Sequence, residues 1–265
     1  MADKLPRRGF LERGAALAGT LVLAGCDGLT GSRWANDQLG EVENLTRVAQ
    51  RLFAGGHALA PEYSKADIAP VFRPNGTLDP GTNDYTIHRA SGFKDWIVPV
   101  GGLVETPLKL SVADIRKMPS RTQITRHDCV EGWSCIGEWK GTPLSLILAK
   151  AKPKAEARYV VFYCADPMGA EDVDAQGNLI PRPFYYESLD LLEATHPQTI
   201  LAYELNGQVL PVEHGAPLRL RAERQLGYKM PKYVQRIDLV ERFDRIGGGK
   251  GGYWEDQGYQ WYGGI

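Results

Sequence analysis

The feature that most constrains this chain is the mixed order of strand-like and helix-like segments after residue 95. "DWIVPVGGLV", "TQITRHDCV" and "ARYVVFYCADP" are typical of strands, and "TILAYELNGQVLP" places the turn pair Asn206-Gly207 between two apolar runs. We expect short helices in "SVADIRKMP", where Ser111 is the predicted cap, and in "TPLSLILAKA" and "YYESLDLLEATHP". Residues 217–243 are predicted to form two strands joined by a basic loop. This order predicts one α+β domain built on a mixed β-sheet.

The first residues resemble an export signal. The segment "PRRGFLERGAALAGTLVLAGC" has paired arginines ahead of Phe10 and Leu11, which is similar to a twin-arginine signal. Its apolar run, residues 15–25, is well short of the roughly 20 residues that cross a bilayer. The letters "LAGC" resemble a lipoprotein processing site, in which Cys26 becomes lipid-modified. We therefore expect a periplasmic protein held at the inner membrane by a lipid anchor. An ordinary N-terminal helix is the alternative.

Composition divides the chain into four parts. We predict a signal peptide in residues 1–25, a tether with a short helix in residues 26–55, and the main domain in residues 56–246. The main domain opens with an irregular segment up to residue 84. A glycine-rich tail follows in residues 247–265. The tail is either an interaction surface or an irregular wrap that lays five aromatic side chains over the domain: Tyr253, Trp254, Tyr259, Trp261 and Tyr262.

Charge and cysteine content limit the possible functions. A net charge of −1 gives no basic surface for nucleic acid, so that class is excluded. Apart from Cys26, which would carry the lipid, the mature chain has three cysteines, an odd number for an exported protein, so at least one is expected to be a free thiol or a ligand. The sequence contains no C-x-x-C-H, flavin or nicotinamide signature. Electrons for any redox reaction would then have to come from a partner.

Three stretches carry a resemblance to a known family. "CVEGWSCIGEWKGTPL", "LLEATHPQTILAYELNGQVLPVEHGAPLRLRAERQLGYKMPKYV" and the twin-arginine leader resemble the sulfite oxidase family of molybdenum enzymes. The likeness covers roughly residues 71–240. It is strongest to the periplasmic branch, which includes the catalytic subunit of a protein-methionine-sulfoxide reductase. The resemblance implies a barrel-like, mixed-sheet molybdopterin-binding fold and a molybdenum-molybdopterin cofactor.

Cys129 matches the cysteine of that family whose thiolate binds molybdenum beside the two dithiolene sulfurs of molybdopterin. A polarisable thiolate suits such a metal, whose charge keeps the thiol deprotonated. Arg126 and His127 are expected to favour the thiolate as well. The alternative for Cys129, and the preferred interpretation of Cys135 and Cys164, is a small buried apolar side chain.

The resemblance also implies the residues that bind the pterin and its phosphate. Positively charged side chains and a close backbone approach suit a phosphate. The matching positions are His214, Arg219, Gly227, Tyr228, Lys229 and Lys232, and the looser match "VFRPNG" adds Phe72, Arg73 and Asn75. Taken one at a time, the charged members are equally typical of solvated surface positions.

Four further residues are candidates for the surroundings of the metal. Glu131 matches a glutamate of the reductase branch, whereas sulfite oxidases have a basic segment there, and a carboxylate would repel sulfite. Asp166 and either Tyr185 or Tyr186 are predicted at the substrate mouth. The alternatives are an ion pair of Glu131 with Arg126 or Lys140, a helix cap at Asp166, and ordinary packing of the tyrosines.

Together these features predict a molybdopterin-dependent oxidoreductase that transfers an oxygen atom to or from a small substrate. Sulfoxide or N-oxide reduction and sulfite-type oxidation are both compatible with it. The resemblance implies a monomer, since the dimerisation domain of sulfite oxidases has no counterpart here, and we expect a membrane cytochrome b or quinone-linked electron partner. Two other hypotheses remain open: a non-catalytic lipoprotein that serves as a binding module, and a thiol redox protein that uses Cys129 with Cys135.

Overall fold

The computed structural model describes residues 45, 47–49, 58–174 and 176–265. The chain divides into two compact units, residues 1–53 and 54–265, and the second is described below. The predicted signal peptide and nearly all of the tether lie outside the described residues. Of the helix expected near residues 41–53, only Leu45 and residues 47–49 are described, and they are helical. No helix in the described part of the chain is long and apolar enough to cross a membrane.

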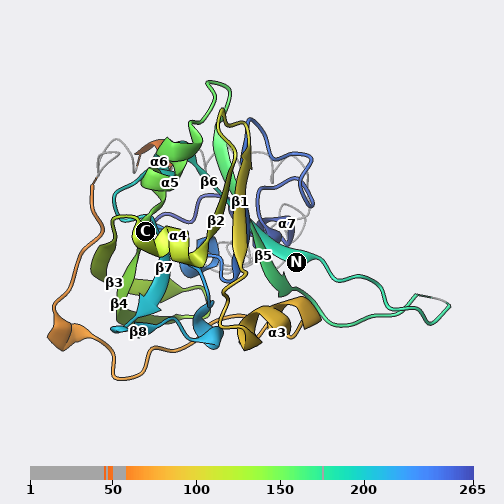
Figure 1. The fold of residues 1–265 in the computed structure, drawn as a ribbon, viewed down its shortest axis with the longest axis horizontal. Coiled ribbons are helices and arrows are strands. Elements are labelled where there is room, and N and C mark those ends of the chain that lie inside the picture. The colour runs from red at the N-terminus through yellow and green to blue at the C-terminus, as the bar shows by residue number, and fades with distance from the viewer. Residues whose placement is uncertain (1–44, 46, 50–57, 175) are drawn as a thin grey trace, which may run out of the picture. The chain divides into compact units, whose positions relative to one another are not determined.

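One sheet contains the only parallel strand pair among the described residues (Figure 1). Parallel pairing joins β1 to β10, and the other neighbours are antiparallel. This pairing brings residues near 100 beside residues near 238. The strands run across the sheet in the order β2 (Leu108–Ser111), β1 (Ile97–Gly102), β10 (Val234–Val240), β5 (Tyr159–Pro167) and β6 (Phe184–Asp190).

The second sheet is antiparallel throughout its described strands. Its β7–β8 hairpin turns at Asn206 and Gly207, whose φ angles of 51° and 74° are those the Asn-Gly pair favours. β4 occupies one edge of β7, and β8 and β9 share the other edge, where β8 pairs with residues 204–205 and β9 with residues 200–202. The strands are β3 (Arg121–Cys129), β4 (Trp133–Pro143), β7 (Ile200–Leu205), β8 (Gln208–Val209) and β9 (Arg219–Arg221).

The helices are short. The predicted cap at Ser111 is confirmed, because its hydroxyl accepts a hydrogen bond from the Asp114 amide at 3.1 Å. Pro143 precedes the first turn of α5, as predicted. The helical elements are η1 (Lys65–Asp67), α3 (Asn83–Ala90), α4 (Val112–Lys117), α5 (Leu144–Ala151), α6 (Leu191–Ala194), η2 (Val212–His214), η3 (Gly227–Lys229) and α7 (Tyr253–Asp256).

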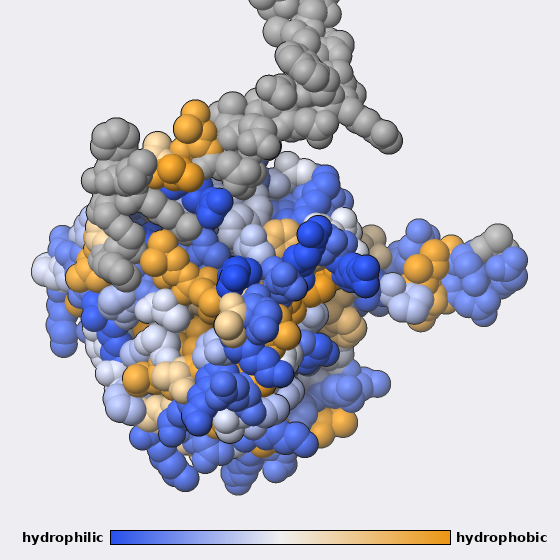
Figure 2. Space-filling model, turned by 90° about the horizontal axis from the view of Figure 1, so that it is seen from above, coloured by the Kyte–Doolittle hydropathy of each residue, from blue (hydrophilic) through white to orange (hydrophobic). Residues whose placement is uncertain are grey.

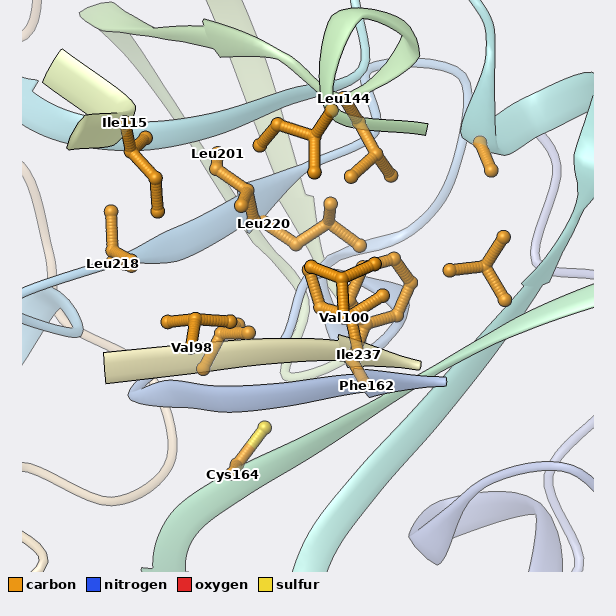
Figure 3. Close-up of a cluster of buried hydrophobic side chains, with 14 of the residues drawn as sticks. Val98, Val100, Ile115, Leu144, Phe162, Cys164, Leu201, Leu218, Leu220 and Ile237 are labelled. Atoms are coloured by element: carbon orange, nitrogen blue, oxygen red, sulfur yellow. The ribbon is translucent and has the colours of Figure 1, made fainter. Parts of the chain in front are cut away.

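The main apolar core fills the space between the two sheets. Figure 3 shows Val98, Val100 and Ile237 of the first sheet below Leu201 and Leu220 of the second. Alternation along β7 sends Leu201 into this core and its neighbours, Ile200 and Ala202, into a second cluster with Phe72 and Trp139. β7 is therefore buried on both faces. On the surface seen in Figure 2, apolar side chains occur in small groups among hydrophilic ones.

Three elements differ from the sequence prediction. The helix expected from residue 185 is wrong in its first half, because residues 184–190 form β6 and only then does Asp190 cap the short α6. β4 was not predicted. It contains Gly137 and Gly141, which permit close contact: a Cβ on Gly141 would lie 2.2 Å from the Leu201 carbonyl oxygen. α3, capped by Thr82, lacks an apolar repeat that would predict it.

Candidate active site

Cys129 is the last residue of β3, next to the turn of the β3–β4 hairpin. It pairs with Trp133 across a three-residue turn, in which Gly132 has a φ of 87° and donates its amide to the Cys129 carbonyl at 3.0 Å. The thiol is half-buried and free. The predicted strand end is thus confirmed, and it holds Cys129 at the edge of the sheet.

Cys129 lines a cavity of about 170 Å³. The wall is assembled from segments far apart in the sequence, including the irregular segment before α3, the end of β5, the loop around η3 and the C-terminal tail. Seven of the predicted site residues or their stated alternatives contribute to it together with Cys129: Asn75, Glu131, Asp166, Tyr185, Gly227, Tyr228 and Lys232.

Burial raises the pKa of the Cys129 thiol, and the nearby charge of Glu131 acts in the same direction. The opposing positive charges are Arg219 and Arg73. The expectation that Arg126 and His127 favour the thiolate is wrong, because Arg126 is exposed and pairs with Asp128 at 2.9 Å, and burial lowers the pKa of His127 well below its usual value. The protein alone therefore favours the thiol, and a bound metal would have to supply the charge that deprotonates it.

Glu131 is exposed at the cavity rim. Its Oε2 atom accepts a hydrogen bond from the Trp133 indole at 3.0 Å. The alternative partners for Glu131 are wrong, because Arg126 pairs with Asp128 and Lys140 pairs with Glu204. The carboxylate is held by the hairpin turn and places negative charge beside Cys129.

Asp166 lies in the cavity wall near the end of β5 and is 4% exposed. It caps no helix in the described structure, so that alternative is wrong. Its Oδ1 atom is buried and has no hydrogen-bond partner among the described residues. Burial raises the pKa of Asp166 to about 6, against the attraction of Lys232. Asp166 can therefore carry a proton near neutral pH.

Arg219 is completely buried on β9. Its guanidinium donates to the Asn75 side chain at 3.2 Å and to the His214 carbonyl at 3.3 Å, and it lies 5.3 Å from the Trp139 ring centroid. Its Nε atom has no partner in the described structure, and neither has the buried Nδ1 atom of His214. Burial and the charge of Arg221 lower the pKa of Arg219 to about 9. Such a desolvated cation favours the binding of an anion.

Lys232 is a buried cation in the cavity wall, whereas Arg219 and His214 do not line the cavity. Its Nζ atom donates to the backbone carbonyls of Asn75 at 2.7 Å, Glu213 at 2.9 Å and Thr77. Burial and the charge of Arg219 lower the pKa of Lys232 to about 7. Lys232, Arg219 and Asn75 therefore form one hydrogen-bonded group beneath the irregular segment.

Lys229 is placed elsewhere. Its ammonium is buried in ion pairs with Glu187 and Glu255, and it does not line the cavity. These carboxylates raise the pKa of Lys229 in spite of its burial. Its charge is already neutralised, so the structure gives it a packing role instead of the predicted contact with phosphate.

Gly227 lies where no side chain fits. A Cβ atom there would be 2.5 Å from the ring of His127. His127 is buried, its Nδ1 atom lies 2.9 Å from Arg221, and its Nε2 atom has no partner among the described residues. The sequence analysis used His127 only as a neighbour of the thiol. His127 lies on β3, two residues before Cys129, and its Nε2 atom is a further buried polar atom without a partner among the described residues.

The remaining predicted residues have mixed placements. Phe72 is buried, and its ring centroid lies 5.1 Å from that of Trp139. It belongs to the second apolar cluster and does not line the cavity. Arg73 is exposed and lies 5.3 Å from the Trp133 ring centroid. Of the two tyrosines, Tyr185 lines the cavity, whereas the Tyr186 hydroxyl donates to Asp256 at 2.5 Å and lies outside the lining.

The sequence analysis missed several cavity residues. Thr77 and Met168 lie in irregular segments with no motif. Trp254 and Tyr259 belong to the tail, for which a wrap was one of two interpretations. Only the density of aromatic residues in the tail could have indicated them.

The cavity fits an anionic organic cofactor that carries a metal. Cys129 offers one soft thiol to the cavity, and Lys232 is a buried cation in its wall. Arg219 does not line the cavity but donates to Asn75, which does, and neither cation has a carboxylate within 4 Å among the described residues. A molybdopterin would satisfy these groups, with Cys129 on the metal and Arg219, Lys232, His214 and Asn75 toward its phosphate and pterin. Lys229 is not available for this role.

A known protein family matches most of the second compact unit. The family described as "Oxidoreductase molybdopterin binding domain" matches residues 85–245 of the chain. That span contains Cys129, Asp166, Arg219 and Lys232.

Individual relatives carry related names. A protein of Azospira oryzae, provisionally named protein-methionine-sulfoxide reductase subunit YedZ1, is 34% identical over 97% of this chain and 87% of its own length. The protein-methionine-sulfoxide reductase catalytic subunit MsrP of Xanthomonas axonopodis pv. citri is 40% identical over 56% of this chain and 45% of its own length. Among solved structures, the sulfane dehydrogenase SoxCD from Paracoccus pantotrophus superposes with a TM-score of 0.47 and 25% identity, over 56% of this chain and 39% of that one.

Proposed function

Because the chain belongs to the oxidoreductase molybdopterin-binding domain family, we propose that it reduces a small sulfoxide or N-oxide by oxygen-atom transfer in the cavity at Cys129. Family membership confirms the expected enzyme class, the α+β fold and the molybdenum-molybdopterin cofactor. The observation that carries the proposal is that one cavity is lined by the Cys129 thiol, the buried cation Lys232 and the buried carboxyl group of Asp166, whose Oδ1 atom has no partner among the described residues. A second buried cation, Arg219, donates to the lining residue Asn75. An S-oxide is favoured as substrate by the names of the relatives.

The cofactor, when bound, supplies the two-electron oxygen-atom transfer. The protein holds and orients it. Cys129 would be the thiolate ligand, and Arg219 and Lys232 would neutralise the phosphate with charge-assisted hydrogen bonds. Glu131 at the rim would repel sulfite, which favours a neutral oxide over that anion as substrate.

The reaction consumes protons. Reduction of a sulfoxide takes two electrons and two protons, and yields a thioether and water. Asp166 can hold one of these protons at its Oδ1 atom, because that atom faces no other partner and the pKa of the group is raised to about 6. Electrons would come from outside the chain, and a membrane cytochrome b or quinone-linked protein is the partner we propose. The names of the relatives, which call them subunits, support a partner.

The proposed location is the periplasmic face of the inner membrane, reached through twin-arginine export and held by a lipid on Cys26. The support is the sequence "PRRGFLERGAALAGTLVLAGC" alone, which lies outside the described residues. A protease-accessibility measurement on spheroplasts, with Arg7→Lys and Arg8→Lys in one variant, tests export. Palmitate labelling of the wild type and of Cys26→Ser tests the anchor.

An activity screen tests the reaction. Cofactor-loaded protein is mixed with a reduced viologen and a panel of dimethyl sulfoxide, methionine sulfoxide and trimethylamine N-oxide, and sulfite with an artificial acceptor serves as the opposite reaction. We expect viologen oxidation with sulfoxides and none with Cys129→Ser, which should also lose molybdenum. Turnover of sulfite alone would contradict the proposal, and a folded, metal-free wild type would favour the non-catalytic binding module.

A further inference from the structure

The glycine-rich tail, residues 247–265, is part of the packed unit. Several of its glycines lie against other segments at distances that exclude a side chain. A Cβ atom on Gly247 would be 2.4 Å from the Tyr186 hydroxyl, and one on Gly252 would be 2.8 Å from the Glu187 carboxylate. Close backbone approach explains why this segment has so many glycines.

The tail is attached at both ends. Near its start, Glu255 pairs with Lys229, and the Ser188 hydroxyl donates to the Gly251 carbonyl at 2.5 Å. Near its end, the Tyr228 hydroxyl donates to the Gln260 carbonyl at 2.7 Å, and the Leu226 amide donates to the Gly263 carbonyl at 2.7 Å. The stretch between these attachments is held over the loop that contains η3.

Trp254 and Tyr259 lie in that stretch, and both line the cavity with Cys129. Their ring centroids are 5.3 Å apart, and Tyr259 meets Tyr228 edge to face, also at 5.3 Å. Met168 and Met230 complete this side of the cavity. The cavity therefore has a polar side, with Asn75, Asp166 and Lys232, and an aromatic side that the tail largely supplies.

We propose that Trp254 and Tyr259 are specificity-determining residues that hold the alkyl groups of the oxide substrate, which rests on the proposed sulfoxide or N-oxide reduction. Methyl groups next to a polarised S–O or N–O bond carry partial positive charge, and the faces of aromatic rings attract it. The polar side of the cavity suits an anionic cofactor, because Lys232 lines it and Arg219 donates to its Asn75. Among the described residues that line the cavity, no cation lies on the aromatic side, and Lys229 near it is neutralised by Glu187 and Glu255. A compact dialkyl sulfoxide or a methyl thioether S-oxide suits such a wall.

Leucine substitutions test this proposal, since they keep bulk but remove the aromatic face. We expect Trp254→Leu and Tyr259→Leu each to raise KM for dimethyl sulfoxide about tenfold, with kcat within about threefold and molybdenum content unchanged. Tyr259 is 41% exposed, so its replacement should leave the fold intact. Trp261→Phe is the control, because Trp261 lies in the same tail, stacks on Phe243 and does not line the cavity. Its KM should equal that of the wild type.

Two results would overturn the proposal. Loss of molybdenum in Trp254→Leu and Tyr259→Leu, with normal content in Trp261→Phe, would place these rings against the cofactor. An unchanged KM in both leucine variants would leave them a packing role only. Binding of dimethyl sulfone to the oxidised, cofactor-loaded protein, followed by tryptophan fluorescence, separates this proposal from the reaction itself. If the wild type reduces no oxide, the proposed function fails. The wall proposal then stands or falls on whether the leucine variants lose sulfone affinity.

Discussion

Two buried lysines, three residues apart in one loop, have opposite environments. Lys229 lies between the carboxylates of Glu187 and Glu255, which raise its pKa, whereas Lys232 faces three backbone carbonyls, and burial lowers its pKa to about 7. The first lysine is a satisfied part of the fold. The second has no carboxylate partner among the described residues and, with Arg219, favours an anionic ligand. A buried charge thus indicates a binding site only when its neighbours leave it uncompensated.

The largest expected effect is at the satisfied lysine. Lys229→Met leaves two carboxylates buried without their cation, and we expect the free energy of unfolding to fall by about 3–5 kcal/mol. Urea denaturation of the cofactor-free protein measures this change. Combining Lys229→Met with Glu187→Gln and Glu255→Gln should restore most of the loss. A Lys229→Met protein of wild-type stability would show that the two lysines do not differ as described.

Asp166 is a buried acid whose charge acts on the pKa of Lys232. It should make the free energy of unfolding depend on pH. Its pKa is 3.8 ordinarily and about 6 in the folded chain, so the folded state binds the proton more tightly than the unfolded state. Stability should therefore fall as the pH rises from about 4 to 6, by about 3 kcal/mol in total. Thermal unfolding of cofactor-free wild type and Asp166→Asn across this range tests the sign. Asp166→Asn should lack this part of the decline. Equal slopes of stability against pH in the two proteins would contradict the raised pKa of Asp166.

Lys232→Met should affect stability little and cofactor binding strongly, the opposite of what is expected for Lys229→Met. Removal of a desolvated cation that is bound only by carbonyls should cost no more than about 1–2 kcal/mol. Molybdenum content after purification should nevertheless fall at least about tenfold, as expected when a charge-assisted contact of 1.5–3 kcal/mol is lost. Metal analysis beside the melting temperature checks both parts. A Lys232→Met protein with full molybdenum content would remove Lys232 from the cofactor site.

The smallest effect is expected at Cys135. It is a half-buried residue of β4 that packs against the cluster of Phe72 and Trp139, and it does not line the cavity with Cys129. Cys135→Ser should change stability by less than about 1 kcal/mol and leave molybdenum content and activity intact. Cys129→Ser is the matched variant and should lose both. Loss of activity in Cys135→Ser alone would favour the thiol redox hypothesis.

Local signals in the sequence predicted much of the fold. The Ser111 cap, the Asn206-Gly207 turn and the strand that ends at Cys129 each depend on a few neighbouring residues, and the structure has them. β6 and β4 were missed because pairing with their neighbouring strands, β5 for β6 and β3 and β7 for β4, outweighs local preference. The cavity could be anticipated at Cys129, Asp166 and Lys232. The partners of Lys229 and the contribution of Trp254 could not, since the tail and β6 meet only in three dimensions.

The attachment of the tail has a consequence for biosynthesis. Trp254 and Tyr259 are translated after every other residue that lines the cavity, and Glu255 reaches Lys229 only once that stretch has left the ribosome. In a nascent chain that ends before residue 254, the cavity beside Lys232 would lack Trp254 and Tyr259 and would be open on its aromatic side. The order of synthesis therefore allows the prosthetic group to enter before the aromatic side closes, and the tail would then help to retain it.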